Sequence, residues 1–289
     1  MNSRLTLPNF VIIGAMKCGT STLRYALHNH PDIFMVYPNE PRFFFSDTAW
    51  SQGLEHYSKF FENTGKAKIL GEGSGFYGWR AYNPKTAKRM AQAIPNAKLI
   101  YMVRHPIERI VSHWSWEIAN GKPVGSLEKA IKNHSYYIEM SMFYEQICAY
   151  RDYFDDSQIK ILFLEDLKSN STAFYEDCYS FLGVDSSLHN HEVNSQVINE
   201  TAGRLTDTSF LMRVRTLPGM QSLRNLFPKS LIAILKPLLK TTKKPEILWS
   251  ECFKQEVEAQ VFPDSVRFLD YAGKPRNFWC FESQNDSTY

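Results

Sequence analysis

The chain has 289 residues, of which 44% are hydrophobic and 22% charged, and its formal net charge is +3. This composition is typical of a globular protein with one large α/β domain or two small ones, and the modest charge argues against a nucleic-acid-binding protein. No apolar run approaches the length of a membrane-spanning helix, which is about 18 residues. The N-terminal segment is too short and polar for a signal peptide. We therefore expect a cytoplasmic protein if the chain is complete, and a luminal Golgi location if it is a domain of a longer, membrane-anchored protein.

Strand-like and helix-like segments alternate along the first two thirds of the chain, which predicts a parallel sheet covered by helices on both faces. The expected strands comprise residues 10–14, 33–36, 68–72, 97–104 and 159–164. The expected helices lie after the first strand, over 84–93, from 105–106 onward, and over 142–154 and 172–182. The predicted fold is a three-layer α/β/α domain with a central parallel sheet and a helical C-terminal cap.

The composition changes near residue 203. Residues 204–244 carry nine Lys or Arg residues against one acid, a local charge of +8 that leaves −5 for the rest of the chain. Prolines divide this stretch into short expected helices. We interpret it as a helical lid with a solvated basic face, as a docking surface for an acidic acceptor such as an anionic glycan, or as a peripheral contact with an anionic membrane. One or two final helices are expected over 246–269, with Trp279 as an apolar anchor.

The five cysteines are scattered and show no metal-ligand spacing. We therefore expect buried, reduced thiols, and a bridge between Cys252 and Cys280 stays open as an alternative. No metal is expected.

The segment after the first strand carries the strongest functional signal. Gly14 and Gly19 bracket a turn of P-loop length that leads into a helix, a geometry that binds phosphate or sulfate on backbone N–H groups. The lysine, however, is Lys17, inside the loop, and not the residue after the second glycine as in the nucleotide P-loop. The pattern therefore predicts an anion-binding loop that differs from that of an ATPase or GTPase.

A second motif, Arg104 to Ser112, follows the fourth expected strand. In a P-loop NTPase the equivalent strand usually ends in an Asp that holds Mg²⁺, whereas here it ends in a cation. Arg104 at the carboxyl end of a strand suits an anion, and Ser112, about two helical turns later, can donate a hydroxyl to the same anion. The two motifs together predict a metal-free ligand with two separate anionic groups.

This pair of motifs resembles the signature of sulfotransferases that use 3′-phosphoadenylyl sulfate (PAPS), of the heparan-type and bacterial branch. The resemblance implies a single P-loop-like sulfotransferase domain with a core over 8–200, a basic helical insertion over 201–245 and C-terminal helices over 246–289. It places the 3′-phosphate on Arg104 and Ser112. It places the 5′-phosphosulfate on the loop residues Lys17, Cys18, Gly19, Thr20, Ser21 and Thr22, with Lys243 and Lys244 in a late basic loop that closes over the nucleotide.

The resemblance also assigns catalytic roles. The segment Asn39 to Phe45 resembles the block in which a glutamate is the catalytic base, so Glu40 takes that role, with a solvated or ion-paired carboxylate as the alternative. Sulfuryl transfer needs positioning and charge stabilisation, and Lys17 is placed to stabilise the leaving phosphate oxygen. Arg42, Glu72 and Ser74 are candidates for acceptor binding, although the segment Gly71 to Ser74 lacks the lysine and the proline that relatives often carry there.

The expected function is transfer of a sulfuryl group from PAPS, with release of 3′,5′-adenosine bisphosphate (PAP), to a hydroxyl or, as second choice, an amine of a glycan, glycolipid or small metabolite. Two alternatives are a P-loop nucleotide kinase, which would need Mg²⁺ and ATP, and a non-catalytic anion-binding protein on the same fold. We expect acceptor choice to lie in loops over 46–66, 114–140 and 190–245.

Overall fold

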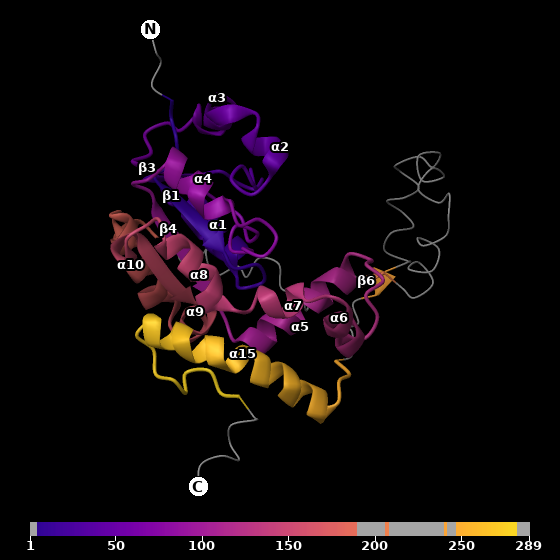
Figure 1. Cartoon of the computed structure of the whole chain (residues 1–289). Coiled ribbons are helices and arrows are strands. Elements are labelled where there is room, and N and C mark those ends of the chain that lie inside the picture. Colours follow the sequence, from indigo (N-terminus) through magenta and orange to yellow (C-terminus); the bar gives the residue numbers. More distant parts are fainter. Residues whose placement is uncertain (1–4, 190–205, 208–239, 242–246, 282–289) are drawn as a thin grey trace.

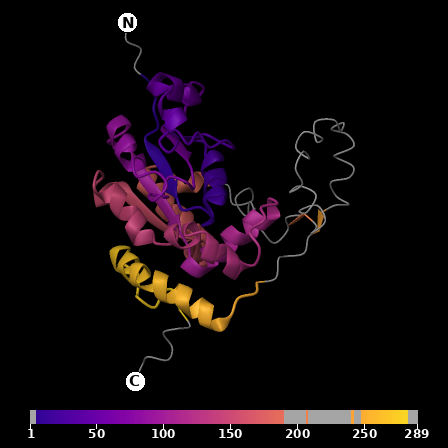
Figure 2. The same cartoon turned by 45° about the vertical axis from the view of Figure 1, so that its right-hand side comes forward.

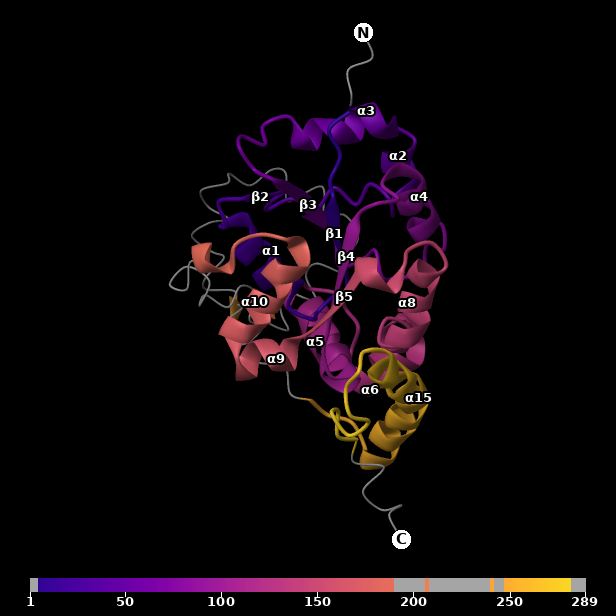
Figure 3. The same cartoon turned by 90° about the vertical axis from the view of Figure 1, so that its left-hand side faces the viewer.

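A computed structural model describes residues 5–189, 206–207, 240–241 and 247–281. Its centre is a five-stranded parallel sheet in the order β2-β3-β1-β4-β5, seen between two helical layers in Figure 3. The strands are β1 (Phe10–Gly14), β2 (Ile33–Met35), β3 (Ile69–Gly73), β4 (Lys98–Val103) and β5 (Ile159–Phe163). All five were expected from the sequence. The order changes direction at β1, so the carboxyl ends of β1, β3 and β4 form one edge at a topological switch point.

Helices cover both faces of the sheet. One face carries α1 (Thr20–His28), α9 (Leu164–Ser169) and α10 (Ser171–Leu182); the other carries α4 (Thr86–Ala93), α8 (Phe143–Arg151) and α15 (Glu251–Tyr271) (Figure 3). Alternate residues of β1 supply the two cores, with Phe10 and Ile12 packing in the cluster that includes α1 and α10, and Val11 and Ile13 in the cluster on the α4, α8 and α15 side. The predicted α/β/α architecture is confirmed.

The segments expected to be loops contain short helices. Residues 46–66 form α2 (Asp47–Trp50), α3 (Gly53–Ser58) and a 3₁₀ turn, η1 (Lys59–Phe61). The helix α5 runs over Pro106–Ala119, and α6 (Leu127–Asn133) and α7 (Tyr136–Glu139) follow it. Serine side chains cap α2 and α6, since Ser46 accepts from the N–H of Ala49 and Ser126 from that of Lys129. The expectation of loops over 46–66 and 114–140 was wrong because these helices are too short to show an apolar period.

The C-terminal cap is one long helix, α15, that continues through Pro263. It lies at the end of the domain opposite α3 in both views (Figures 1 and 2). Asp264 fixes it to α8, because its carboxylate accepts from the N–H groups of Tyr144 and Glu145 at 3.0 Å each. Trp279 is 2% exposed and packs on Phe163 and Phe268, as expected for an apolar anchor.

Further short elements complete the description. The 3₁₀ turn η2 (Asp156–Gln158) precedes β5, and η3 (Ser186–Leu188) follows α10. The short strand β6 (Thr206–Asp207) pairs antiparallel with β7 (Lys240–Thr241). The remainder of the 204–244 stretch, with its expected helices, lies outside the described residues. All five cysteines lie within the described residues and all are free, so Cys252 and Cys280 are not bridged.

Candidate active site

The loop between β1 and α1 is the first of the two predicted anion-binding motifs. Gly19 is the N-cap of α1 with a left-handed φ of 91°, and it provides no capping side chain. A Cβ there would lie 2.9 Å from the side-chain ends of Leu164 and Met102, which can move, so it is the left-handed conformation that favours glycine at this position. The first turn of α1 contains no acidic residue. The N–H of Thr22 donates to the Gly19 carbonyl at 3.0 Å, so the N–H groups before it and the positive end of the helix dipole are what this end of the helix offers to an anion.

The side chains of this loop differ in exposure. Lys17, with a φ of 70°, is partly exposed, and its ammonium lies 5.8 Å from the Trp116 ring. Cys18 is fully buried, burial raises the pKa of its thiol to about 12, and its N–H donates to the Ala15 carbonyl at 3.2 Å. Thr20 and Thr22 are mostly buried, and Ser21 is partly exposed. The loop thus offers one ammonium, one accessible hydroxyl and backbone N–H groups.

Arg104 joins the second motif to the loop. Its Nη1 donates to the carbonyl of Lys17 at 3.5 Å, and its Nη2 pairs with Glu108. The Nε is buried and has no hydrogen-bond partner among the described residues. Ser112 lies on α5 and is partly exposed. The two predicted anion motifs therefore meet at one edge of the sheet, and the unsatisfied Nε fits a site that is completed by an anionic ligand.

Glu40 lies in the connection after β2 and is held by three donors. Arg24 Nη1 lies 3.1 Å from Oε1, while Arg42 Nε lies 3.4 Å and Ser74 Oγ 2.9 Å from Oε2. The Glu40 side chain is 24% exposed. The carboxylate is therefore ion-paired, as the alternative interpretation expected, and is at the same time fixed in place and accessible to solvent.

Arg24 was not predicted as a site residue. It is 4% exposed on α1, and its Nη2 donates to the carbonyls of Val36, Pro38 and Asn39 at 3.1, 3.3 and 2.5 Å. Arg24 therefore fixes the path of the chain into Glu40. Its spacing, four residues after Thr20 and three before Leu27, places it on the buried side of the helix, and this is the signal that marks it in the sequence.

The connection after β3 supports Glu40 and approaches the anion loop. The Ser74 side chain is 1% exposed, so it positions Glu40 and has almost no surface to offer an acceptor. A Cβ on Gly73 would lie 2.7 Å from Ile12 Cβ, and one on Gly75 would lie 3.0 Å from Met16 Cα. A side chain at either position therefore requires a shift of the neighbouring atoms of β1 or of the anion loop.

Glu72 lies in the protein interior. Its carboxylate is fully buried and accepts hydrogen bonds from Tyr57 at 3.0 Å and Tyr77 at 2.6 Å. Burial raises its pKa to about 7, while the two tyrosine donors oppose that rise. The side chain has no exposed surface for the acceptor contact considered from the sequence.

Arg42 is the most exposed of the candidate acceptor-binding residues. Its side chain is 49% exposed, its guanidinium carbon lies 4.3 Å from the centre of the Phe76 ring, and its φ is 51°. Phe43 and Phe44 are buried in the core, and Phe45 is partly buried. Arg42 therefore presents a cation at the surface next to Glu40.

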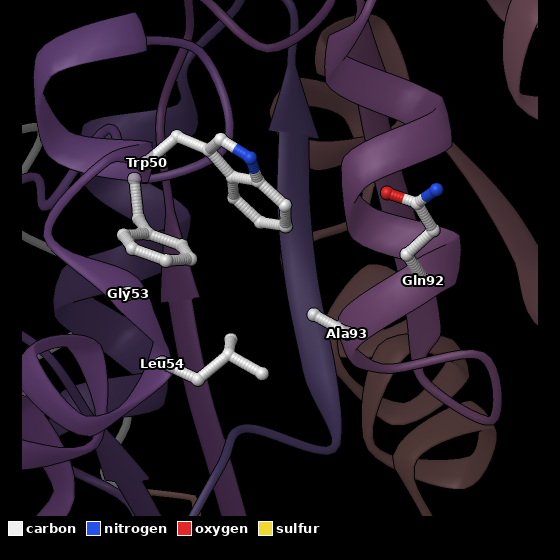
Figure 4. Close-up of a pocket in the computed structure, with 6 residues that line it drawn as sticks. Trp50, Gly53, Leu54, Gln92 and Ala93 are labelled. Atoms are coloured by element: carbon white, nitrogen blue, oxygen red, sulfur yellow. The ribbon is translucent and has the colours of Figure 1, made fainter.

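A separate apolar cavity of about 220 Å³ lies between α2–α3 and α4. Figure 4 shows Trp50 and Leu54 facing Gln92 and Ala93 across it. No charged side chain lines it. The cavity therefore has no groups that would hold a phosphate or sulfate.

Three further observations concern the described part of the chain alone. It contains no group of three or more His, Cys, Asp or Glu residues that could hold a metal ion. None of its helices is long and apolar enough to cross a membrane. Lys243 and Lys244, expected to close over the nucleotide, lie outside it.

The fold and the site together define a class. The parallel sheet has a first strand that leads through a Gly-bearing loop into a helix, and Arg104 contacts that loop. This arrangement is that of a P-loop-like α/β domain. The sulfotransferase domain family matches residues 7–206. The chain belongs to this family, whose members are enzymes of sulfuryl transfer.

Known proteins with related sequences carry the same domain. Membrane-associated sulfotransferase kil1 of Dictyostelium discoideum is 38% identical over 117 residues, which are 39% of this chain and 24% of that protein. The human bifunctional heparan sulfate N-deacetylase/N-sulfotransferase 2 is 26% identical over 209 residues, which are 63% of this chain and 23% of that protein. The matches thus span about a quarter of the length of these relatives. A sulfotransferase from Alicyclobacillus acidocaldarius has the same fold, with a TM-score of 0.64 and 23% identity over 93% of this chain and 97% of that one.

Proposed function

We propose that this chain transfers a sulfuryl group from PAPS to a hydroxyl acceptor, with PAP as the other product. The observation that carries the proposal is the contact of Arg104 with the Lys17 carbonyl, which brings two anion-binding motifs to one sheet edge. A ligand with two separate anionic ends, a 5′-phosphosulfate and a 3′-phosphate, matches this pair. The loop from Lys17 to Thr22 would hold the first, and Arg104 with Ser112 the second.

The residues of this chain would divide the work of transfer. The bound donor supplies the sulfuryl group. Glu40 takes the proton of the acceptor hydroxyl as its oxygen forms the new bond to sulfur. Lys17 and the first-turn N–H groups of α1 stabilise the negative charge on the phosphate oxygen as its bond to sulfur breaks. Arg24 and Ser74 hold Glu40 in position, so the base needs no reorganisation.

The acceptor is proposed to be a hydroxyl, or as second choice an amine, of a glycan, glycolipid or small metabolite. One relative is named for heparan sulfate and another for membrane association. The Arg42 cation beside Glu40 favours an acceptor that carries an anionic group near the reacting hydroxyl, such as an anionic glycan. The basic stretch 204–244 would add to this preference.

Binding of PAP tests the cofactor. In titration calorimetry, Lys17→Ala and Arg104→Ala should each weaken PAP binding at least about tenfold, since each loses a charge-assisted contact. Arg276→Ala is the matched control, because Arg276 is exposed and pairs with Asp270 away from the loop. The proposal would be overturned if the unmodified protein did not bind PAP, or if Lys17→Ala and Arg104→Ala both bound PAP as tightly as the unmodified protein.

Turnover tests the base. Glu40→Gln should lower the rate of sulfuryl transfer about 10²–10⁴-fold, the usual contribution of a general base, while PAP affinity stays close to that of the unmodified protein. Normal turnover would remove Glu40 from the mechanism. The kinase alternative predicts Mg²⁺-dependent ATP turnover, and the binding-protein alternative predicts PAP binding without transfer to any acceptor.

A further inference from the structure

A platform of aromatic side chains lies beside Glu40, and the proposed function gives it no role. The platform consists of Phe45, Phe76 and Tyr82. The centre of the Phe45 ring lies 5.7 Å from that of Phe76 and 5.2 Å from that of Tyr82, with an angle of 18° between the planes of the Phe45 and Tyr82 rings. Phe45 and Phe76 are partly exposed, and Tyr82 is 66% exposed. The three rings therefore present a stretch of aromatic surface to solvent.

Arg42 and Ser74 connect this platform to Glu40. The Arg42 guanidinium carbon lies 4.3 Å from the centre of the Phe76 ring, and its Nε lies 3.4 Å from Glu40 Oε2. The backbone N–H of Phe76 donates to Ser74 Oγ at 3.2 Å, and the same hydroxyl donates to Glu40 at 2.9 Å. The platform therefore begins one side chain away from the carboxylate that is proposed to take the acceptor proton.

The platform joins two connections of the sheet. Phe45 follows β2, whereas Phe76 and Tyr82 belong to the connection between β3 and α4. Asn83 is 6% exposed, and its Nδ2 donates to the Phe45 carbonyl at 2.5 Å, which fixes one connection to the other. Mutual packing of the two connections is the competing explanation for the rings. Packing alone would gain most from a buried ring, whereas Tyr82 leaves most of its surface in contact with water.

Exposed cations belong to the same two connections. They are Arg42, Arg80 and Lys85. The carboxylate of Asp47, at the start of α2, pairs with Arg89 and lies 4.0 Å from Lys85 Nζ. The carboxylate of Glu40 pairs with Arg24 and Arg42. Because both carboxylates of the segment that follows β2 are already paired, an acceptor with an anionic group meets an attractive potential here.

A sugar ring that carries an anionic group fits this combination. The face of an aromatic ring is electron-rich and attracts the polarised C–H bonds on the face of a pyranose. The equatorial hydroxyls of a pyranose extend outward from its edge, so a sugar that lies flat on Phe76 can direct one hydroxyl toward Glu40. Its carboxylate or sulfate can accept hydrogen bonds from Arg42. A purely aromatic acceptor would also stack, but apolar ligands are usually enclosed in deep pockets, whereas Tyr82 is open to solvent.

We infer that the platform and Arg42 form the acceptor-binding site, which holds the face of a sugar ring that carries a carboxylate or sulfate and directs a hydroxyl of that ring to Glu40. The inference rests on the proposed function and narrows its acceptor to an acidic sugar. Tyr82 and Arg42 are then specificity-determining residues, because the first selects the ring by stacking and the second selects the anion by charge.

Direct binding of sugars to the protein saturated with PAP tests this site. The probes are oligosaccharides that contain glucuronic acid, their carboxyl-reduced neutral forms, and para-nitrophenol as an aromatic probe, with affinities measured by NMR titration. The variants are Tyr82→Ala, Tyr82→Phe and Arg42→Gln. Tyr153→Ala is the matched control, since Tyr153 is a 48% exposed tyrosine that follows α8 and lies outside the platform. PAP affinity and melting temperature are measured for every variant.

We expect Tyr82→Ala to weaken binding of the acidic oligosaccharides about five- to tenfold. Tyr82→Phe should bind them within about twofold of the unmodified protein, because the ring face and not the hydroxyl makes the contact. Arg42→Gln should weaken binding of the acidic forms at least about tenfold and change that of the neutral forms by no more than about twofold. PAP affinity should be the same in all variants, and Tyr153→Ala should bind the sugars as the unmodified protein does.

Three results would overturn the inference. The first is that no acidic oligosaccharide binds to the protein saturated with PAP. The second is an unchanged sugar affinity in Tyr82→Ala together with a lowered melting temperature, which mutual packing alone predicts. The third is tighter binding of para-nitrophenol than of the sugars, which would assign the platform to an aromatic acceptor. Each of these results leaves PAP binding intact, whereas failure of the unmodified protein to bind PAP would overturn the proposed function itself.

Discussion

The buried carboxyl of Glu72 should make the unfolding free energy depend on pH by an amount that can be calculated. Its pKa is raised by burial from 4.5 to about 7 in the folded protein. The folded state therefore binds a proton more tightly than the unfolded state, and the stability that this proton provides is lost as pH rises from 4.5 to 7. At 1.36 kcal/mol for each tenfold change in affinity, the loss is about 3 kcal/mol over this interval.

The perturbation is Glu72→Gln, which keeps an oxygen that can accept from Tyr57 and Tyr77 and removes the titration. Other groups with shifted pKa values, such as Asp264 and His113, act equally in both proteins and cancel in the difference. The variant should therefore gain about 3 kcal/mol relative to the unmodified protein between the lower and the higher pH.

Urea unfolding monitored by tryptophan fluorescence at a series of pH values measures this difference. A difference in unfolding free energy that stays constant across the interval would refute the assignment of a raised pKa to Glu72. A difference that changes in the opposite direction would show that the folded state favours the ionised carboxylate.

Three further predictions follow from the site and the cap. Partial burial raises the pKa of Glu108, but its pairing with Arg104 outweighs this effect and holds the pKa below its usual range. Glu108 therefore competes with an anionic ligand for Arg104, and because Glu108 is 52% exposed, Glu108→Gln should tighten PAP binding by no more than about fivefold, or about 1 kcal/mol. Weaker PAP binding by this variant in calorimetry would contradict the competition. Arg24→Met should lower turnover about 10²-fold, because the substitution releases Glu40 and the carbonyl groups that position it. PAP affinity should change little. An unchanged kcat would show that Glu40 needs no such support. Trp279→Ala should lower the unfolding free energy by about 3–5 kcal/mol, because the ring is 2% exposed and packs on Phe268. Urea unfolding measures this change, and a loss below about 1 kcal/mol would contradict the role of Trp279 as an apolar anchor.

Short apolar runs in the sequence predicted the strands of the sheet, because the strands of a parallel sheet are covered by helices on both faces. The run from Phe10 to Gly14 is apolar throughout, and this is what a central parallel strand requires. The helix that opens at His105-Pro106 was also predictable, and His105 indeed caps it, since its Nδ1 accepts from the N–H of Ile107. The anion motifs were recognisable because each follows directly on such a strand.

The rest of the site depends on contacts between distant segments. The spacing of Arg24 marks it as buried, but only the structure shows that its partners are Val36, Pro38, Asn39 and Glu40. The tyrosines that enclose Glu72 lie 15 residues before it and 5 after it, on α3 and in the connection after β3. No local pattern links these residues, because tertiary packing alone brings them together.

In the proposed function, the loop from Gly14 to Thr22 and Arg104 hold a sulfuryl donor in position for transfer. The most direct test is incubation of the protein with radiolabelled PAPS and a panel of hydroxyl and amine acceptors that includes anionic glycans, with label transfer and PAP release measured together. We expect label on an acceptor in equal amount to the PAP released, and loss of both in Lys17→Ala. Binding of PAP with no label transferred to any acceptor would contradict it and would favour a non-catalytic anion-binding protein.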